Sequence, residues 1–184
     1  MKITKGFTLV ELMVVVVVIG IGSSLALPSF QNMVARNRLA TQTNDLILAI
    51  NLTRSEASRV GGIVSIQAAA SSVGDEFGGG YCIVLGSPGD CDDPVLRRFP
   101  ALQGNATLAG IDNAAGGGDW NSPRTSIQFS GMGGLSGTDN QQRYFDLCLD
   151  GQLGRRIQVA LIGRAKSWRE AEAGDPVPSV QPDC

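Results

Sequence analysis

Few residues in this sequence could carry chemistry, and the most unusual of them is one carboxylate in an apolar run. Glu11 lies in the stretch FTLVELMVVVVV, from Phe7 to Val18, which is otherwise free of charge. A carboxylate at the centre of a membrane costs roughly 2.5–3.5 kcal/mol on insertion scales. An ionisable residue in such a place therefore indicates a function and a partner of opposite charge.

Other catalytic or metal-binding patterns are weak. The sequence contains no histidine, which removes His-based triads and His-containing zinc sites. Its glycine-rich stretches lack the phosphate-loop pattern, and no nucleophile has a base beside it. Asp90, Asp92 and Asp93 do not have the spacing of a calcium loop, whose twelfth position would be Ala101, so we expect a solvated turn. We expect no enzymatic activity, no cofactor and no metal.

A basic cluster lies near Trp168 and consists of Arg155, Arg156, Arg164, Lys166 and Arg169. The formal charge of the whole chain is −2, which excludes a strongly basic nucleic-acid binder but not a local phosphate-binding patch. Two interpretations stay open: a patch that contacts phosphates, and an ordinary solvated strand end with its tail.

The element that must position Glu11 is a long helix. Residues 7–27 contain one charge among 21 residues, and about 20 apolar residues in a helix cross a hydrocarbon core of ~30 Å. Lys2 and Lys5 precede this stretch, so the N-terminus is expected in the cytoplasm and the rest outside. Residues 28–60 continue as an amphipathic helix, which Pro28 should bend and Gly61-Gly62 should end.

The rest of the chain, residues 61–184, is predicted to be a β-rich globular domain. Its apolar residues alternate with polar ones in short runs separated by glycine-rich turns, which predicts strands at 63–69, 81–85, 95–99, 125–130, 143–149 and 155–162. No helical crossovers separate these strands. The predicted fold class is therefore α+β, with a long N-terminal helix, half transmembrane and half amphipathic, packed on a C-terminal antiparallel sheet.

Three interpretations of the N-terminal segment compete. A secretory signal peptide cleaved near Ser23 to Ala26, or a plain membrane anchor, would leave Glu11 unexplained. The sequence KGFTLVE, Lys5 to Glu11, closely resembles the processing motif of type IV prepilins and type II secretion pseudopilins. That resemblance implies a leader of residues 1–6, cleavage by prepilin peptidase between Gly6 and Phe7, and methylation of the new amino group. It also implies that Glu11 pairs with the N-terminal amine of a neighbouring subunit.

The globular part resembles the H-type pseudopilins and the related minor pilins of type IV pili. The resemblance rests on 127–131 (IQFSG), on Phe145-x-Leu147-Cys148 with the glycines at 151 and 154, and on 156–164. It implies a single-pass protein of the bacterial inner membrane with a periplasmic domain. It further implies assembly with other major and minor pilins or pseudopilins into a pilus or pseudopilus, as a tip subunit that primes assembly.

A second function follows from the segment GRAK, Gly163 to Lys166. It resembles the G-R-x-R element of minor pilins that bind DNA in natural transformation, with Lys166 in place of the second arginine. Lysine keeps the charge but loses the bidentate phosphate geometry. DNA binding in DNA uptake is the alternative function.

The four cysteines are expected to form disulfides, because the implied topology places all of them in the periplasm. Three pairings are possible. We favour Cys82–Cys91, which closes a short loop, and Cys148–Cys184, which would tie the C-terminal tail to a strand.

Overall fold

A computed structural model describes residues 6–72, 74–92, 95–112, 124–136, 142–149 and 154–168. The chain divides into two compact units, residues 1–37 and residues 38–184. Each unit is described by itself below.

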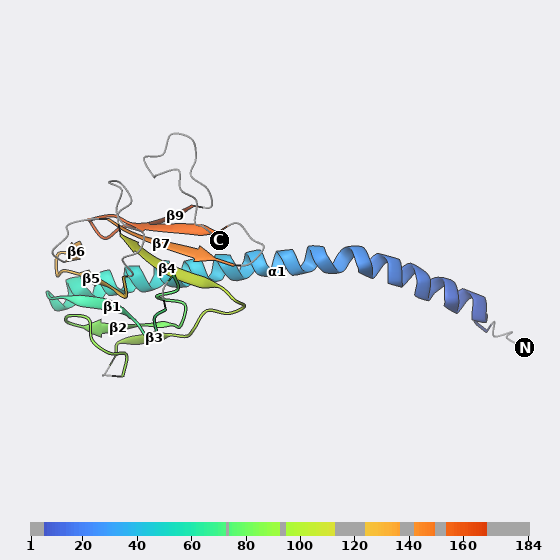
Figure 1. The fold of residues 1–184 in the computed structure, drawn as a ribbon, viewed down its shortest axis with the longest axis horizontal. Coiled ribbons are helices and arrows are strands. Elements are labelled where there is room, and N and C mark those ends of the chain that lie inside the picture. The colour runs from blue at the N-terminus through green and yellow to red at the C-terminus, as the bar shows by residue number, and fades with distance from the viewer. Residues whose placement is uncertain are drawn as a thin grey trace, which may run out of the picture. The chain divides into compact units, whose positions relative to one another are not determined.

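One helix, α1 (Leu9–Val60), supplies the described structure of the first unit and continues into the second (Figure 1). The described side chains of residues 6–24 and 26–33 are all exposed. The helix includes the valine run 14–18, although β-branched residues form helices poorly in water. It also passes through Pro28 without ending, and the bend at Pro28 stays a prediction.

In the second unit, α1 buries one stripe at alternating steps of four and three residues. The stripe consists of Leu39, Thr43, Leu46, Ile50, Thr53 and Ala57. The two threonines are tolerated there because each hydroxyl donates to the carbonyl four residues earlier, Thr43 to Leu39 and Thr53 to Ala49, both at 2.7 Å. This confirms the amphipathic pattern expected for the second half of the helix.

The helix ends where the sequence predicts. Gly61 has φ +65°, and the amide of Gly62 donates to the carbonyl of Ala57 at 3.3 Å. This is the Schellman arrangement, in which a residue in the left-handed region satisfies a carbonyl of the last turn.

The strands form two antiparallel sheets. The first has the order β3-β2-β1-β5-β6, with β1 at Val64–Ala68, β2 at Tyr81–Leu85, β3 at Arg97–Phe99, β5 at Ser126–Phe129 and β6 at Leu135–Ser136. The second has the order β4-β7-β8-β9, with β4 at Thr107–Asp112, β7 at Arg143–Cys148, β8 at Arg155–Val159 and β9 at Ala165–Trp168. The α+β class is confirmed. Strands β4, β6 and β9 were not predicted, and the predicted strand 155–162 ends at Val159.

Aromatic rings of the core connect the two sheets. Phe77, in the segment between β1 and β2, is fully buried and meets Tyr81 of β2 and Phe145 of β7 edge-on, at centroid distances of 6.3 and 5.2 Å. Tyr81 also stacks on Phe99 at 4.8 Å. Burial, and secondarily the charge of Asp45, raises the pKa of the Tyr81 phenol well above its ordinary value.

Two carboxylates fasten β4 to the segment between β1 and β2. Asp75 accepts a hydrogen bond from the amide of Leu108 at 2.7 Å, and the buried Glu76 accepts one from the amide of Gly110 at 3.1 Å. The amide of Phe77 returns a bond to the carbonyl of Leu108 at 2.9 Å. These bonds occupy the edge of β4 that β7 leaves open, and they tie the second sheet to the first.

Candidate assembly site and nucleic-acid interface

The site predicted around Glu11 is a reciprocal cap on the start of α1. The Glu11 carboxylate accepts hydrogen bonds from the amide and the hydroxyl of Thr8, both at 3.0 Å. The amide of Glu11 donates to the Thr8 hydroxyl at 3.2 Å. This is a capping box, with threonine before the first helical residue and glutamate at the third. Thr8 was not among the predicted site residues, although its spacing T-x-x-E with Glu11 is the sequence pattern of a capping box.

The surroundings of Glu11 are apolar and uncovered within this chain. Phe7 is exposed, and so are the large apolar side chains of the first helical turns after it: Leu9, Val10, Leu12, Met13, Val14, Val15, Val16, Val17, Val18, Ile19 and Ile21. Within the described residues, α1 is the one helix long and apolar enough to cross a membrane. Exposed apolar area of this extent needs lipid or neighbouring helices to cover it.

The first predicted disulfide is present. Cys82 of β2 is joined to Cys91 with Cα atoms 5.8 Å apart, and Val84 and Val95 pack beside the bridge. Cys148 at the end of β7 is also disulfide-bonded. Cys184, its predicted partner, lies outside the described residues, so the Cys148–Cys184 pairing stays a prediction.

The acidic turn offers little to a cation. Asp90 and Asp92 are exposed, and Asp93 lies outside the described residues. In the part of the chain that the structure describes, no group of three or more cysteine, aspartate or glutamate side chains could hold a metal ion.

The basic cluster divides into exposed and buried members. Arg164 and Lys166 are exposed, Arg155 is half-buried and Arg156 is buried. Arg169 and the side chain of Trp168 lie outside the described residues. The cluster therefore does not present all of its charges to one ligand.

Arg156 must be removed from the candidate DNA-binding residues. Its guanidinium forms a bidentate pair with Asp146, with Nε–Oδ1 at 2.7 Å and Nη2–Oδ2 at 2.6 Å. The two side chains are only 3% and 7% exposed. The residues are direct partners in the register of β7 and β8, so the pair fastens these strands together. A phosphate would have to displace Asp146 and leave a carboxylate buried without its cation, which is strongly unfavourable.

The GRAK segment forms the end of a hairpin. The amide of Gly163 donates to the carbonyl of Ala160 at 2.7 Å, and the amide of Ala160 donates to the carbonyl of Arg164 at 2.9 Å. Gly163 has φ +77°, which favours glycine, and Lys166 lies opposite Gln158 in the register of β8 and β9. Arg164 and Lys166 thus lie on a turn and an edge strand, on which both side chains are accessible.

Two protein-family models match this chain, one over its globular part and one over its N-terminal segment. Residues 42–163, about two thirds of the chain, match the family "Type II transport protein GspH", and residues 1–27 match the prokaryotic N-terminal methylation motif. The chain belongs to the GspH family. Its family and its N-terminal motif are those of pilin-like proteins, which are structural subunits.

Individual relatives are pilins. Fimbrial protein EcpC of Eikenella corrodens is 46% identical over 43 residues, which cover 23% of this chain and 28% of that protein. The chain spans about a third or less of the first such relatives. One type IV major fimbrial protein FimA of Dichelobacter nodosus is 31% identical over 122 residues, covering 62% of this chain and 71% of FimA. The type IV minor pilin FimU of Pseudomonas aeruginosa superimposes with a TM-score of 0.58 at 24% identity, over 76% of this chain and 95% of FimU, which shows the fold.

Proposed function

We propose that this GspH-family chain is a filament subunit matured by prepilin peptidase and assembled through α1. The peptidase cuts between Gly6 and Phe7 and methylates the amino group of Phe7. Before assembly, the chain crosses the bacterial inner membrane once, with its N-terminus in the cytoplasm and residues 61–184 in the periplasm. The observation that carries this proposal is the capped carboxylate of Glu11 within a wholly exposed apolar helix start that also bears the methylation motif.

Assembly replaces the surroundings of Glu11. In the single chain, Thr8 is the donor that Glu11 has, and the carboxylate is exposed. Cleavage creates an ammonium group on Phe7, and a carboxylate in an apolar filament core is tolerated once it is paired and hydrogen-bonded. The amine of a neighbouring Phe7 is the cation that assembly brings within reach, so Glu11 sets the register of packing.

Within the filament, we propose a tip position in which the chain primes assembly of a type IV pilus or a type II secretion pseudopilus. Membership of the H-type branch supports this position. The partners are other major and minor pilins or pseudopilins, the prepilin peptidase and the inner membrane.

The test is Glu11→Ala in the full-length chain in its host. We expect cleavage and methylation to be unchanged, measured by mass spectrometry of the mature N-terminus, while recovery in sheared filaments falls at least tenfold. Thr8→Val is a useful companion, because it removes the hydroxyl and keeps the carboxylate. Normal recovery of the Glu11→Ala chain would refute the pairing role.

DNA binding is a second candidate function, and the exposure of Arg164 and Lys166 on one hairpin favours it. Two phosphate contacts give weak affinity with a shallow salt dependence, a slope of roughly −0.9 per contact on duplex DNA. We expect the full-length chain in detergent to retard duplex DNA at low salt, and Arg164→Ala with Lys166→Ala to abolish the retardation. Asp146 and Arg156 stay unchanged in that variant. Absence of retardation at low salt would eliminate this function.

A further inference from the structure

A group of exposed apolar side chains in the second unit lies around the end of α1. Six of them, here called the end surface, are 39–95% exposed: Val60, Ile63, Leu85, Met132, Leu161 and Ile162. Met132 and Ile162 are the most exposed of the six, at 95% and 66%. Figure 1 shows that α1 ends beside β1, β5 and β6, whose adjoining turns carry several of these residues.

Backbone contacts bring these residues together. The amide of Gly86 donates to the carbonyl of Ile63 at 2.8 Å, so Leu85 lies beside the start of β1. A Cβ on Gly131 would lie 2.5 Å from the backbone of Gly61, so the turn between β5 and β6 lies against the end of the helix.

The two most exposed side chains lie on neighbouring turns. Met132 is on the turn between β5 and β6, and Ile162 is on the turn between β8 and β9. A Cβ on Gly163 would collide with the carbonyl oxygen of Gly133, so the two turns are in close contact. Each turn therefore supports the other, and both apolar side chains project from this support into solvent.

Both turns close hydrogen bonds of their own backbone. The amide of Gly133 donates to the carbonyl of Ser130 at 2.8 Å, and the amide of Gly163 donates to the carbonyl of Ala160 at 2.7 Å. Amides and carbonyls without partners are costly to remove from water, and lipid offers them none. These internal bonds lower the cost of bringing the turns into the headgroup region of a membrane.

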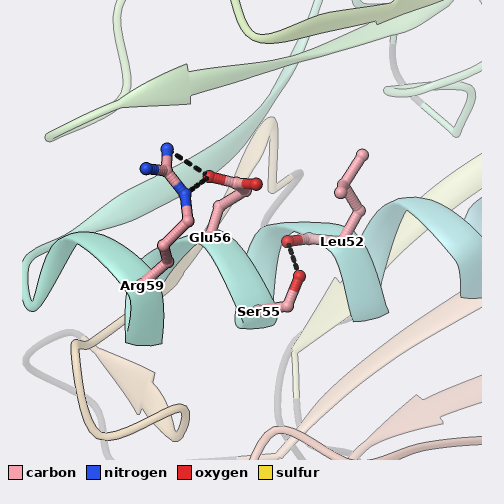
Figure 2. Close-up of polar contacts among 4 residues, drawn as sticks. All are labelled: Leu52, Ser55, Glu56 and Arg59. Atoms are coloured by element: carbon pink, nitrogen blue, oxygen red, sulfur yellow. Dashed lines mark hydrogen bonds and ion pairs between the residues drawn. The ribbon is translucent and has the colours of Figure 1, made fainter.

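The charged side chains next to the end surface are mostly cationic. Arg54 donates to the carbonyl of Gly133 at 3.0 Å, which places its guanidinium beside the turn between β5 and β6. Arg164 directly follows the other turn and is exposed. Arg59, one residue before the end of α1, pairs with Glu56 at 2.7 Å, but its side chain stays 66% exposed (Figure 2).

The shape of the end surface favours a fluid partner. An exposed fraction of 95% means that the Met132 side chain projects almost free of its own unit. A protein partner would need a pocket matched to each projecting side chain, because protein interfaces are packed as closely as protein interiors. Lipid chains are fluid and surround a projecting apolar side chain of any shape.

We propose that the end surface docks on a lipid bilayer with anionic headgroups. Met132 and Ile162 lie at the boundary between headgroups and acyl chains, while Arg59 and Arg164 lie among the headgroup phosphates. Membrane binding of this kind grows with the apolar area buried and with the attraction between basic side chains and anionic lipid. The contact is separate from the packing of α1 in a filament, so it goes beyond the proposed function.

Recruitment of the full-length chain to vesicles tests the proposal. The apolar part of α1 is first held in a nanodisc of phosphatidylcholine, and the loaded discs are mixed with separate vesicles and floated through a density gradient. The vesicles contain either phosphatidylcholine alone or equal parts of phosphatidylcholine and phosphatidylglycerol. We expect at least about tenfold more chain on the anionic vesicles, because each of the two exposed arginines contributes a factor of about five. Added salt should reduce this difference.

Two sets of variants assign the contact to the end surface. Met132→Ser combined with Ile162→Ser should lower recruitment at least about tenfold, because it removes the apolar groups that enter the lipid. Leu48→Ser is the matched control, since Leu48 is also exposed but lies about 18 Å along α1 from the end of the helix. Arg164→Gln should lower recruitment to anionic vesicles about fivefold and leave the neutral ones unchanged. Equal melting temperatures of the variants check that they fold.

A fluorescent amino acid at position 132, or at position 48 as the control, reports direct contact with lipid. Bromine atoms on the acyl chains of the vesicles should quench the fluorophore at 132 and not at 48.

Several results would overturn the inference. Equal recruitment to neutral and anionic vesicles would do so, as would recruitment that survives the Met132→Ser and Ile162→Ser changes, or quenching at 132 no stronger than at 48. Loaded discs that associate with one another through the end surface without vesicles would assign it to a second copy of this chain instead. The Glu11→Ala test of the proposed function uses a different part of the chain, so either idea can fail while the other stands.

Discussion

At the scale of single residues, three charged groups of this chain have specific hydrogen-bond partners. Glu11 is held by Thr8, Glu76 by the amides of Gly74 and Gly110, and Arg156 by Asp146. The two buried groups, Glu76 and Arg156, both have hydrogen-bond partners, which is the condition under which burial of charge is tolerated. Replacing one partner of a buried charged pair should therefore lower the free energy of unfolding more than replacing both partners.

The Asp146–Arg156 pair gives a direct test of that asymmetry. Asp146→Ala should lower the free energy of unfolding by about 3–5 kcal/mol, because it leaves the guanidinium buried without its anion. Asp146→Leu combined with Arg156→Met removes both charges and should cost clearly less. Urea unfolding of the full-length chain in detergent, followed by fluorescence, measures both. If the double variant were the less stable of the two, the pair would be contributing more than compensation for its own burial.

Tyr81 predicts a change of stability at alkaline pH. Its folded-state pKa is raised above the unfolded value of about 10, so the neutral phenol stabilises the fold fully below pH 10 and this contribution is lost as pH rises further. Tyr81→Phe cannot ionise, so the stability of the wild type relative to that variant should be constant below about pH 9 and fall steadily as the pH rises above about 10. Melting temperatures at closely spaced pH values check this. A difference that stays constant through and above about pH 10 would show that the phenol ionises equally in the folded and unfolded states, so that the fold does not raise its pKa.

At the scale of elements, the sequence predicted those features that depend on residues close together in the chain. The buried stripe of α1 and its end at Gly61 follow from side-chain spacing and from the conformational freedom of glycine, and both agree with the structure. The strands at 81–85 and 143–148 contain enough β-branched, aromatic and apolar residues to be recognised from sequence.

The missed strands depend on partners distant in sequence. The sequence of β4, TLAGID, lacks clear alternation, and its edge is fixed by Asp75 and Glu76 more than 30 residues earlier. Strand β9 has four residues and is defined by its register with β8. The pairing of Arg156 with Asp146 depends on the register of β7 and β8 in the same way, so no pattern within 155–170 could reveal it. Glu11, in contrast, could be singled out from sequence because the apolar run and the motif around it are its immediate neighbours in the chain.

The turns at 130–134 and 160–163 lie against each other, and this close approach predicts a glycine requirement. Gly163→Ala places a Cβ against the carbonyl oxygen of Gly133 at φ +77°, so it should lower the free energy of unfolding by about 1–3 kcal/mol. Gly89→Ala is the control, since a Cβ there meets nothing within 4 Å. Denaturant unfolding of both variants gives the comparison. Equal stability of the two variants would mean that the turns shift apart at little cost.

At the scale of the whole molecule, each unit presents apolar surface that the chain itself does not cover. In the first unit this surface is the helix start, and in the second it includes Met132 and Ile162, which are both exposed. A protein with a formal charge of −2 and this distribution of apolar side chains is suited to assembly rather than to an isolated soluble state. Within the second unit, covalent cross-links add to the packing of the sheets, since Cys82 is joined to Cys91 and Cys148 is also disulfide-bonded.

Each disulfide should stabilise the second unit by an amount that grows with the logarithm of the length of chain that it closes. Cys82 and Cys91 are nine residues apart, for which the chain-entropy model gives a stabilisation of about 2.5 kcal/mol. The predicted Cys148–Cys184 bridge closes a longer segment, for which the same model gives about 4 kcal/mol. Cys148→Ser with Cys184→Ser should therefore lower the melting temperature more than Cys82→Ser with Cys91→Ser. Peptide mapping without reduction establishes the connectivity first, and the two double variants are then compared by calorimetry. A larger loss from the Cys82 and Cys91 variant would show that packing of Val84 and Val95 beside the short bridge outweighs loop closure.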